Sequence, residues 1–266
     1  MTAGLHTLSC VSFGVGFRLR ADSELLLPAM LECAPLGTQS LRVEGPGDIE
    51  EFTLWGLGSA GYRLVVCGEV VAEAAEVRAV LEKLTGDLMV YVANHAPDRV
   101  FVHAGVVGWR DCALVLPGTS FAGKTTMVAA LVRAGATYYS DEYAVLDERG
   151  CVHPYARDLQ MREAGSAEQV PVPVGELGGR AGTAPLAVSH IVFTEYAESG
   201  RWDPQPVSAG MAVLEMLRHT IPVQRTPARV MATLGKMMET ATALRSGRGE
   251  ADETARLLLD GIDARV

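Results

Sequence analysis

The segment that decides the fold is GTSFAGKT, residues 118–125. It matches the phosphate-binding loop pattern G-x-x-x-x-G-K-[ST] at every fixed position. The apolar run CALVLP (112–117) precedes it, and the amphipathic stretch TTMVAALVRAG (125–135) follows it. A strand, a glycine-rich loop and a helix in this order direct the loop amides and the positive end of the helix at an anion. The segment therefore predicts a loop that binds the phosphates of a nucleotide.

Each fixed residue of this loop has a physical role. Gly118 and Gly123 permit backbone angles and a close approach that a side chain prevents. Lys124 supplies a positive charge for the β- and γ-phosphates, and the Thr125 hydroxyl is the expected Mg²⁺ ligand. The chain has only three lysines against twenty arginines, and one of them stands here. The alternative is a glycine-rich turn that matches the pattern by chance. The candidate nucleotide-binding residues are Gly118, Thr119, Ser120, Phe121, Ala122, Gly123, Lys124, Thr125 and Thr126.

A pair of adjacent carboxylates, Asp141 and Glu142, follows the loop helix within the apolar stretch TYYSDEYAVLD (137–147), which reads as a strand. One carboxylate can hold Mg²⁺ while the other accepts a proton from an attacking hydroxyl. Neighbours on a strand point to opposite faces, so both reach one site only at a bend or a strand end. The candidate metal ligands are Thr125, Glu142 and Asp141. The alternative is a solvated acidic turn.

Composition limits the classes of protein to which this chain can belong. Its 266 residues are 48% hydrophobic, and a mean hydropathy of +0.17 fits a folded chain with a sizeable core. The net charge of −9 argues against nucleic acid and acidic membranes as partners. No apolar run reaches the roughly 18–20 residues of a membrane helix, and no secretory signal is visible, so we expect a cytoplasmic protein. The five widely spaced cysteines exclude a disulfide scaffold and a zinc ribbon.

The pattern along the chain predicts two domains, a mixed α+β accessory domain over residues 1–97 and a larger domain over 98–266 that carries the loop. In the first we expect strands at 14–21, 52–57 and 62–68 and an amphipathic helix at 73–95. In the second we expect a hairpin of 99–107 with 112–117, a helix at 124–134, strands at 137–147 and 187–196, a long loop at 164–187, and helices at 209–219, 227–246 and 250–260. Residues 218–248 hold six basic groups and one acidic group. The basic groups face either a phosphate or an acidic partner, or they form the solvent-exposed face of a helix.

Four segments carry a resemblance to a known family: His103-Ala104-Gly105, the loop itself, RAGATYYSDEYAVLD (133–147) and GCVHPYARDLQMR (150–162). Together they resemble the kinase domain of the HPr kinase/phosphorylase family. The similarity is closer to relatives found with peptide-modification systems, including kinases of lasso-peptide precursors. The resemblance implies an α/β fold, with a P-loop kinase core of the HPr kinase/phosphoenolpyruvate carboxykinase type and a smaller N-terminal α+β domain. Since HPr kinases are oligomers, it also allows a homo-oligomer.

The resemblance also implies roles for single residues. His103 would lie near the transferred phosphate, Asp141 would be the catalytic base, and Glu142, in place of the family's usual Asp, would lie near the metal. Lys124 and Arg162 would contact the phosphates, which completes the catalytic set His103, Lys124, Asp141 and Arg162. Gln160 stands where the bifunctional HPr enzymes have a Glu, so neither HPr as substrate nor phosphorylase activity is implied.

The resulting expectation is an ATP- and Mg²⁺-dependent kinase that acts on a Ser or Thr hydroxyl of a peptide or small protein. Residues 164–187 and the basic stretch 218–248 are where we expect acceptor specificity. Three alternatives remain open: a kinase of a small alcohol such as free serine, a nucleotide-responsive binding protein, and a decarboxylase related to phosphoenolpyruvate carboxykinase.

Overall fold

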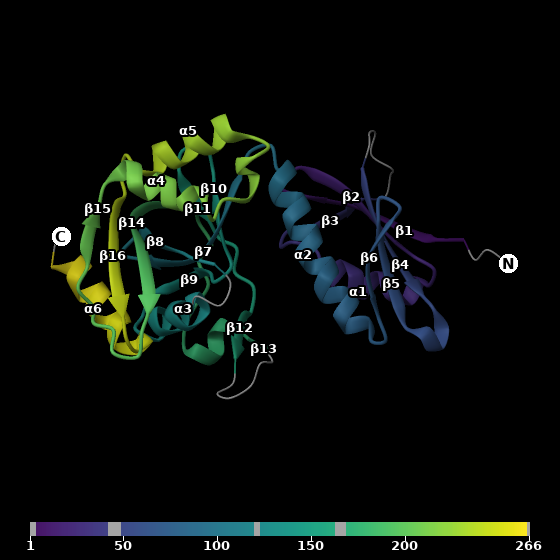
Figure 1. Ribbon diagram of the computed structural model, residues 1–266, viewed down its shortest axis with the longest axis horizontal. Helices are drawn as coiled ribbons and strands as arrows, with labels where there is room; N and C mark the ends of the chain where they lie inside the picture. Colours follow the sequence, from purple (N-terminus) through teal and green to yellow (C-terminus); the bar gives the residue numbers. More distant parts are fainter. Residues whose placement is uncertain (1–3, 42–48, 120–122, 163–168, 265–266) are drawn as a thin grey trace. The chain divides into compact units, whose positions relative to one another are not determined.

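The computed structural model describes residues 4–41, 49–119, 123–162 and 169–264. The chain divides into two compact units, Met1–Asp98 and Arg99–Val266, coloured purple to blue and teal to yellow in Figure 1. This division falls one residue from the domain boundary that the sequence suggests. Both units combine sheets with helices, so the chain is of the mixed α/β class that we expected.

The first unit is built on one six-stranded sheet in the order β3-β1-β2-β4-β5-β6. The long helix of this unit turns Val80, Leu84 and Leu88 inward, and these side chains are fully buried together with Phe17 and Phe52 of the sheet. Their spacing of four residues along the helix is the apolar stripe that the sequence shows. The elements are β1 (His6–Ser12), β2 (Val15–Ala21), η1 (Glu24–Leu26), α1 (Leu27–Glu32), β3 (Gln39–Leu41), β4 (Glu50–Gly56), η2 (Gly58–Ala60), β5 (Tyr62–Val66), β6 (Glu69–Ala74) and α2 (Val77–His95).

The helix expected at residues 73–95 begins later, at Val77, because a strand precedes it. Strand β6 pairs with β5 in an antiparallel hairpin. Cys67 and Gly68 turn this hairpin with φ of 48° and 84°, which is the conformation that two-residue hairpin turns require. The hairpin therefore places residues 69–74 at the edge of the sheet, although Glu and Ala in this segment favour a helix.

The second unit is built on an eight-stranded sheet in the order β11-β10-β7-β8-β14-β16-β15, with β9 also paired to β7. Strands β8, β14 and β16 are parallel to one another, whereas β7 and β8 form the expected hairpin, turned by Arg110 and Asp111 with positive φ. Its strands are β7 (Val100–Trp109), β8 (Cys112–Pro117), β9 (Thr137–Ser140), β10 (Tyr143–Leu146), β11 (Cys151–His153), β14 (Leu186–Tyr196), β15 (Gln205–Val207) and β16 (Thr242–Arg248), and β12 (Leu159–Arg162) with β13 (Gln169–Val172) forms a separate pair.

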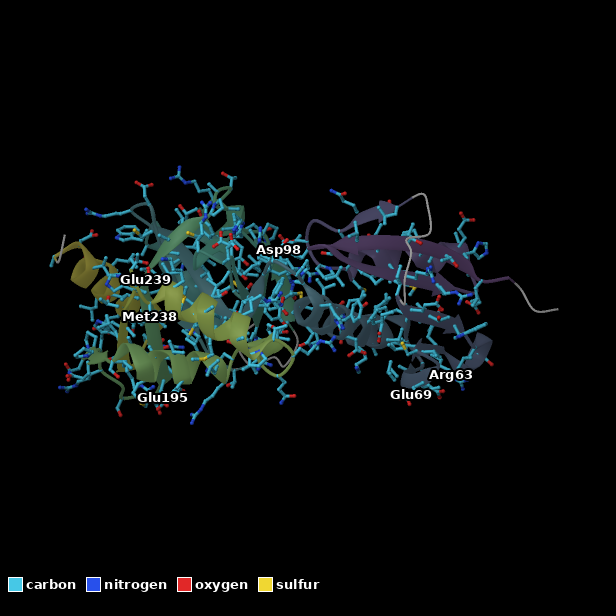
Figure 2. All side chains as sticks on the ribbon, turned by 90° about the horizontal axis from the view of Figure 1, so that it is seen from above. Arg63, Glu69, Asp98, Glu195, Met238 and Glu239 are labelled. Atoms are coloured by element: carbon cyan, nitrogen blue, oxygen red, sulfur yellow. The ribbon has the colours of Figure 1, made fainter. Side chains whose placement is uncertain are left out.

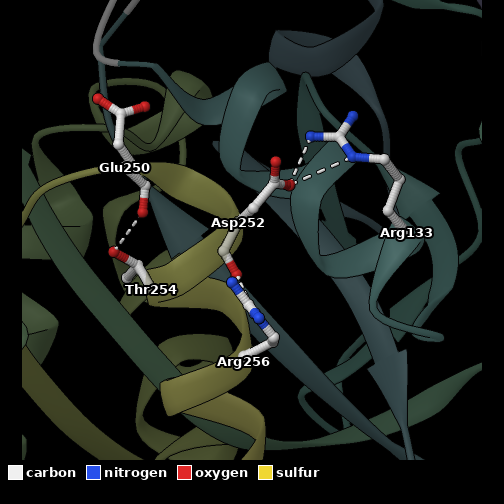
Figure 3. Close-up of polar contacts among 5 residues, drawn as sticks. All are labelled: Arg133, Glu250, Asp252, Thr254 and Arg256. Atoms are coloured by element: carbon white, nitrogen blue, oxygen red, sulfur yellow. Dashed lines mark hydrogen bonds and ion pairs between the residues drawn. The ribbon is translucent and has the colours of Figure 1, made fainter.

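Helices cover both faces of this sheet, so the second unit has three layers (Figure 1). Side chains of α3 and α6 share one buried cluster with the sheet, and side chains of α4 and α5 share the other. Arg133 of α3 donates two hydrogen bonds to Asp252 in the first turn of α6, which fixes the start of α6 against α3 (Figure 3). The helices are α3 (Lys124–Arg133), α4 (Ala209–Leu217), η4 (Ile221–Val223), α5 (Pro227–Met237) and α6 (Ala251–Asp263), and η3 (Val174–Leu177) is a further short helix.

Two expectations for the second unit are wrong. The helix expected at 227–246 ends at Met237, and residues 242–248 form β16, because this segment pairs in parallel with β14. The long loop expected at 164–187 contains β13 and η3 in its described part, and the amide of Gly182 donates to the carbonyl of Tyr138. The described part therefore contains secondary structure and is hydrogen-bonded to β9, although its residues are exposed or half-buried.

The basic stretch 218–248 does not form one surface. Its members lie on different elements, and several have partners of their own: Arg245 and Arg218 pair with Glu215, and Lys236 pairs with Glu239. Arg248 is buried. The basic residues of this stretch therefore share neither one face of a helix nor one phosphate-binding surface. Within the described ranges, no helix is long and apolar enough to span a membrane.

Candidate active site

The candidate site lies at the edge of the second sheet where the parallel strands end. Strand β9 runs antiparallel to β7, which runs antiparallel to β8, so β9 has the same direction as β8. The chain segments that follow β8, β9, β14 and β16 therefore leave the sheet at one edge. In open α/β sheets, ligands bind outside the carboxyl ends of the strands. The expected phosphate loop follows β8, so it lies at this edge.

The described ends of the loop have the geometry that its glycines suggest. The amide of Gly118 donates to the carbonyl of His103 at 3.3 Å. Gly123 has φ of 76°, and a Cβ atom there would lie 2.3 Å from Nη2 of Arg248. Any side chain at Gly123 would therefore be strained and would displace Arg248. Ser120, Phe121 and Ala122 lie outside the described residues, and Thr126 is exposed in the first turn of α3.

Lys124 begins α3 and is almost entirely buried, with 9% of its surface exposed. Its Nζ atom donates to the carbonyl of Thr119 at 2.8 Å. Burial lowers the pKa of Lys124 to about 8, although the charges of Asp141 and Glu142 act in the opposite direction. Lys124 is thus still mostly protonated at neutral pH, and it is a strongly desolvated cation beside two carboxylates.

Asp141 is held by two hydroxyl groups. Oδ2 accepts a hydrogen bond from the Thr125 hydroxyl at 2.8 Å, and Oδ1 accepts one from the Tyr138 hydroxyl, also at 2.8 Å. Asp141 is 8% exposed. Burial and the charge of Asp141 raise the pKa of Tyr138 far above its usual value, so the phenol is a permanent donor. The structure therefore brings together the loop threonine and the expected catalytic base.

The two carboxylates leave the strand at a bend, as their expected shared role requires. The single strand expected at 137–147 is two strands, β9 and β10, and Asp141 and Glu142 lie between them. The Ser140 hydroxyl accepts hydrogen bonds from the amides of Glu142 and Tyr143 at 3.1 and 2.9 Å. The serine side chain thus stabilises a turn that interrupts the strand, and both carboxylates project from this turn. Burial raises the pKa of Glu142, against the opposing charge of Arg157.

His103 lies on β7, directly opposite Tyr143 of β10. The two rings are 5.6 Å apart between centroids, and the backbone amide of His103 donates to the carbonyl of His219 at 2.7 Å. Burial, together with the charge of Lys124, lowers the pKa of His103 to about 4. Its ring is therefore uncharged at neutral pH, and it lies close enough to Lys124 for the lysine charge to affect its pKa.

Four residues of this region escaped the sequence analysis: Tyr138, Arg157, His219 and Arg248. Tyr138 lies three residues before Asp141, but an apolar strand gives no sign that its hydroxyl faces the carboxylate. Arg157 acts on the pKa of Glu142, and Arg248 donates from Nη2 to the carbonyl of Gly123 at 3.2 Å. No sequence signal identifies Arg248, because most of the strand that carries it was expected to be helix. Burial lowers the pKa of His219, and the charge of Lys124 acts in the same direction.

Arg162, expected near the phosphates, is the last residue of β12, where it lies opposite Gln169 of β13. It is exposed, whereas Leu159 of the same strand packs into the core beside α3. The arginine whose charge acts on Glu142 is Arg157, five residues earlier. The role of Arg162 stays a prediction.

The residues of the site fit a Mg²⁺ ion that also binds phosphates. In the described part of the chain, no group of three His, Cys, Asp or Glu side chains forms a metal cage. Mg²⁺ does not need one, because it keeps several waters and binds one or two carboxylates together with substrate phosphates. The Thr125 hydroxyl and the adjacent carboxylates of Asp141 and Glu142 are donors of this kind.

Neither a protein-family model nor a curated protein matches this chain. The resemblance to the HPr kinase family therefore depends on the sequence motifs alone. The functional argument has to be made from the chemistry of the site.

Proposed function

We propose that this chain is an ATP- and Mg²⁺-dependent kinase with a P-loop core of the HPr kinase type. The observation that carries the proposal is the 2.8 Å hydrogen bond between the Thr125 hydroxyl and the Asp141 carboxylate, beside the buried Lys124. A loop that only binds phosphates needs the lysine and the threonine. Transfer of a phosphoryl group to a hydroxyl also requires a carboxylate at the same point that can act as a base.

In the proposed reaction the acceptor hydroxyl oxygen attacks the γ-phosphorus of ATP. The new O–P bond forms as the bond from the γ-phosphorus to the bridging oxygen breaks, and the products are a phosphate ester and ADP. Asp141 accepts the proton of the hydroxyl. Lys124 and the loop amides stabilise the negative charge that develops on the phosphates. His103 is uncharged at neutral pH, so its ring can donate or accept a hydrogen bond at the transferred group without repelling Lys124.

Thr125 and Glu142, with Asp141, are the residues that would hold Mg²⁺. When bound, the ion neutralises charge on the β- and γ-phosphates. Burial raises the pKa of Glu142, and a cation next to this carboxylate favours its ionised form. A bound cation would therefore offset the cost of ionising Glu142 beside Asp141.

A Ser or Thr hydroxyl of a peptide or small protein is the acceptor that the resemblance implies, and the first unit would be an accessory domain of this kinase. The test is transfer of label from γ-labelled ATP, with Mg²⁺, to Ser- and Thr-containing peptides and to free serine. Labelled peptide supports the proposal. Label on serine alone supports a small-molecule kinase, and ATP binding without any transfer supports a nucleotide-responsive binding protein.

Two variants test the division of roles within the site. Asp141→Asn should bind ATP nearly normally and lose on the order of 10³-fold in transfer rate, because it keeps the shape but not the base. Lys124→Ala should lose both binding and transfer. Lys83→Ala is the matched control, since Lys83 is an exposed lysine of the first unit paired with Asp87. An equal loss of ATP affinity in the Asp141 and Lys124 variants would contradict this assignment.

A further inference from the structure

The hydroxyl of Tyr138 lies in a part of the second unit that is otherwise apolar. Tyr138 is a residue of β9 with 1% of its surface exposed, and it belongs to the buried cluster that α3 and α6 share with the sheet. A phenylalanine would fill the same space, whereas burying a hydroxyl is unfavourable unless it is hydrogen-bonded. The tyrosine therefore needs a partner for its hydroxyl, and among the described residues that partner is Asp141, at 2.8 Å.

The carboxylate of Asp141 in turn depends on donors from the protein. Carboxylates such as Glu195 and Glu239 lie at the surface of the second unit, where water can bond to them (Figure 2). Asp141 is 8% exposed, and each of its oxygens accepts a hydrogen bond from one hydroxyl, Oδ2 from Thr125 and Oδ1 from Tyr138. Because these two donors come from α3 and β9, they fix both the position and the rotation of the carboxylate.

The backbone of Tyr138 is held on both sides. It pairs with Val107 of β7. On its other side, the amide of Tyr138 donates to the carbonyl of Arg180 at 2.9 Å, and its carbonyl accepts from the amide of Gly182 at 2.7 Å. A ring that is anchored in this way and packed in a core has little freedom to move. The position of the hydroxyl is therefore set by the sheet and its neighbouring segment.

We propose that Tyr138 is the positioning residue of the catalytic base: its hydroxyl holds the Asp141 carboxylate in the orientation that accepts the proton of the acceptor hydroxyl. The inference rests on the proposed function, because it needs Asp141 to be that base. Enzymes commonly orient a base through a third group in this way. Thr125 would also bind Mg²⁺ in the proposed reaction, so the bond from Tyr138 is the one that acts on the carboxylate alone. At 1% exposure Tyr138 cannot touch a substrate, and its effect on the reaction runs through Asp141.

Tyr139 offers a matched control on the same strand. It is also buried, at 4% exposure, and its hydroxyl also donates at 2.8 Å, but to the backbone carbonyl of Ala184. Neighbouring side chains of a strand point to opposite faces, and Tyr139 belongs to the other buried cluster of the second unit. Tyr138→Phe and Tyr139→Phe therefore remove the same group and a hydrogen bond of the same length, and only the first takes a donor from Asp141.

The test measures transfer of label from γ-labelled ATP, with Mg²⁺ and the full chain, to Ser- and Thr-containing peptides and to water. Tyr138→Phe should lower kcat by about 10–100-fold, because the base loses the hydrogen bond that orients it. The KM for ATP should change by less than about 3-fold, since the contacts to the phosphates remain. Tyr139→Phe should keep kcat within about 2-fold of the unaltered chain. Urea unfolding followed by circular dichroism verifies that both variants are folded under the assay conditions.

A double-mutant cycle shows whether Tyr138 acts through Asp141. In Asp141→Asn the base is already lost, so the addition of Tyr138→Phe should lower the remaining rate by less than about 3-fold. If the two losses multiply instead, Tyr138 does not act through Asp141 and the positioning role is overturned.

The remaining outcomes separate the role of Tyr138 from the proposed function. If the unaltered chain transfers label and Tyr138→Phe keeps its kcat, or if Tyr139→Phe loses as much, the positioning role is overturned while the kinase function stands. If the unaltered chain transfers label to neither peptide nor water, the proposed function fails and this inference fails with it.

Discussion

Replacing Lys124 by methionine should make the protein more stable while it abolishes nucleotide binding. Lys124 is 9% exposed, and its ammonium group donates a hydrogen bond to the carbonyl of Thr119. Methionine has a similar length and is unbranched and uncharged, so it can occupy the same space. The substitution removes the cation that the phosphates need, and with it the cost of burying that cation.

The size of the effect follows from the pKa of Lys124, which burial lowers from 10.5 to about 8. Each pKa unit corresponds to about 1.4 kcal/mol, so the buried charge costs the folded protein on the order of 3 kcal/mol at neutral pH. The lost hydrogen bond to Thr119 returns about 1 kcal/mol of this. We therefore expect Lys124→Met to raise the free energy of unfolding by about 2 kcal/mol at pH 7.

The stability gain of Lys124→Met should decrease as the pH rises. Below pH 8 the lysine is protonated in both the folded and the unfolded chain, so the burial cost is fully present. Between pH 8 and 10.5 the folded chain releases the proton while the unfolded chain keeps it, and the unaltered protein becomes steadily more stable relative to the variant. Most of the gain should be gone at pH 10.

Urea unfolding followed by circular dichroism at pH 7 and pH 10 measures this difference, and calorimetry with ATP measures the loss of binding. Lys83→Met is the matched control, because Lys83 is exposed and forms an ion pair with Asp87. It should change stability by less than about 0.5 kcal/mol at either pH. If Lys124→Met lowers stability at pH 7, or if its gain is the same at both pH values, the argument from the buried charge is refuted.

Further predictions concern backbone positions of the second unit. Ser140→Ala leaves two backbone amides of the bend without their acceptor and should lower the free energy of unfolding by about 2 kcal/mol; a loss no larger than that of Ser40→Ala, at an exposed serine of β3, would contradict it. Gly150→Ala should cost at least about 2 kcal/mol, because Gly150 has φ of 75° and an added Cβ would lie 2.5 Å from the backbone nitrogen of Met237. Gly235→Ala within α5 meets no neighbour and should instead add about 0.5–1 kcal/mol; the same denaturation curves would show whether the two signs differ.

The sequence was most informative where local chemistry allows few conformations. The loop glycines, Lys124 and the apolar stretches on either side predict a strand, a turn and a helix. The structure has the strand at Cys112–Pro117 and the helix at Lys124–Arg133. The bend at Asp141 and Glu142 was not predicted, because the apolar pattern of residues 137–147 favours one continuous strand. Only the shared role expected of the two carboxylates called for a bend or a strand end at this point.

The errors arose where distant parts of the chain determine the local structure. Residues 242–248, TALRSGR, follow α5 after four intervening residues and contain good helix formers, yet they are a strand because β14 offers a parallel partner. Arg248 could not be assigned for the same reason, since its partners at Gly123 and Tyr196 are brought to it only by the sheet. Hydrophobic periodicity predicts which face of a segment is buried. It does not predict which strands become neighbours, and the pairing of β16 and the contacts of Arg248 depend on that.

The parallel core of the second unit has a consequence for how the chain folds during synthesis. Strand β8 carries the loop, but its parallel neighbour β14 begins only at residue 186, and the next strand, β16, begins at residue 242. Pairing over such distances in sequence closes large loops and is slow compared with the hairpins of the first unit. The loop therefore leaves the ribosome long before the sheet that fixes it, and the edge that carries the candidate site is complete only when Arg248 has been made. A chain that stops before β16 would keep the whole phosphate-binding motif and lack the strand that carries its buried arginine.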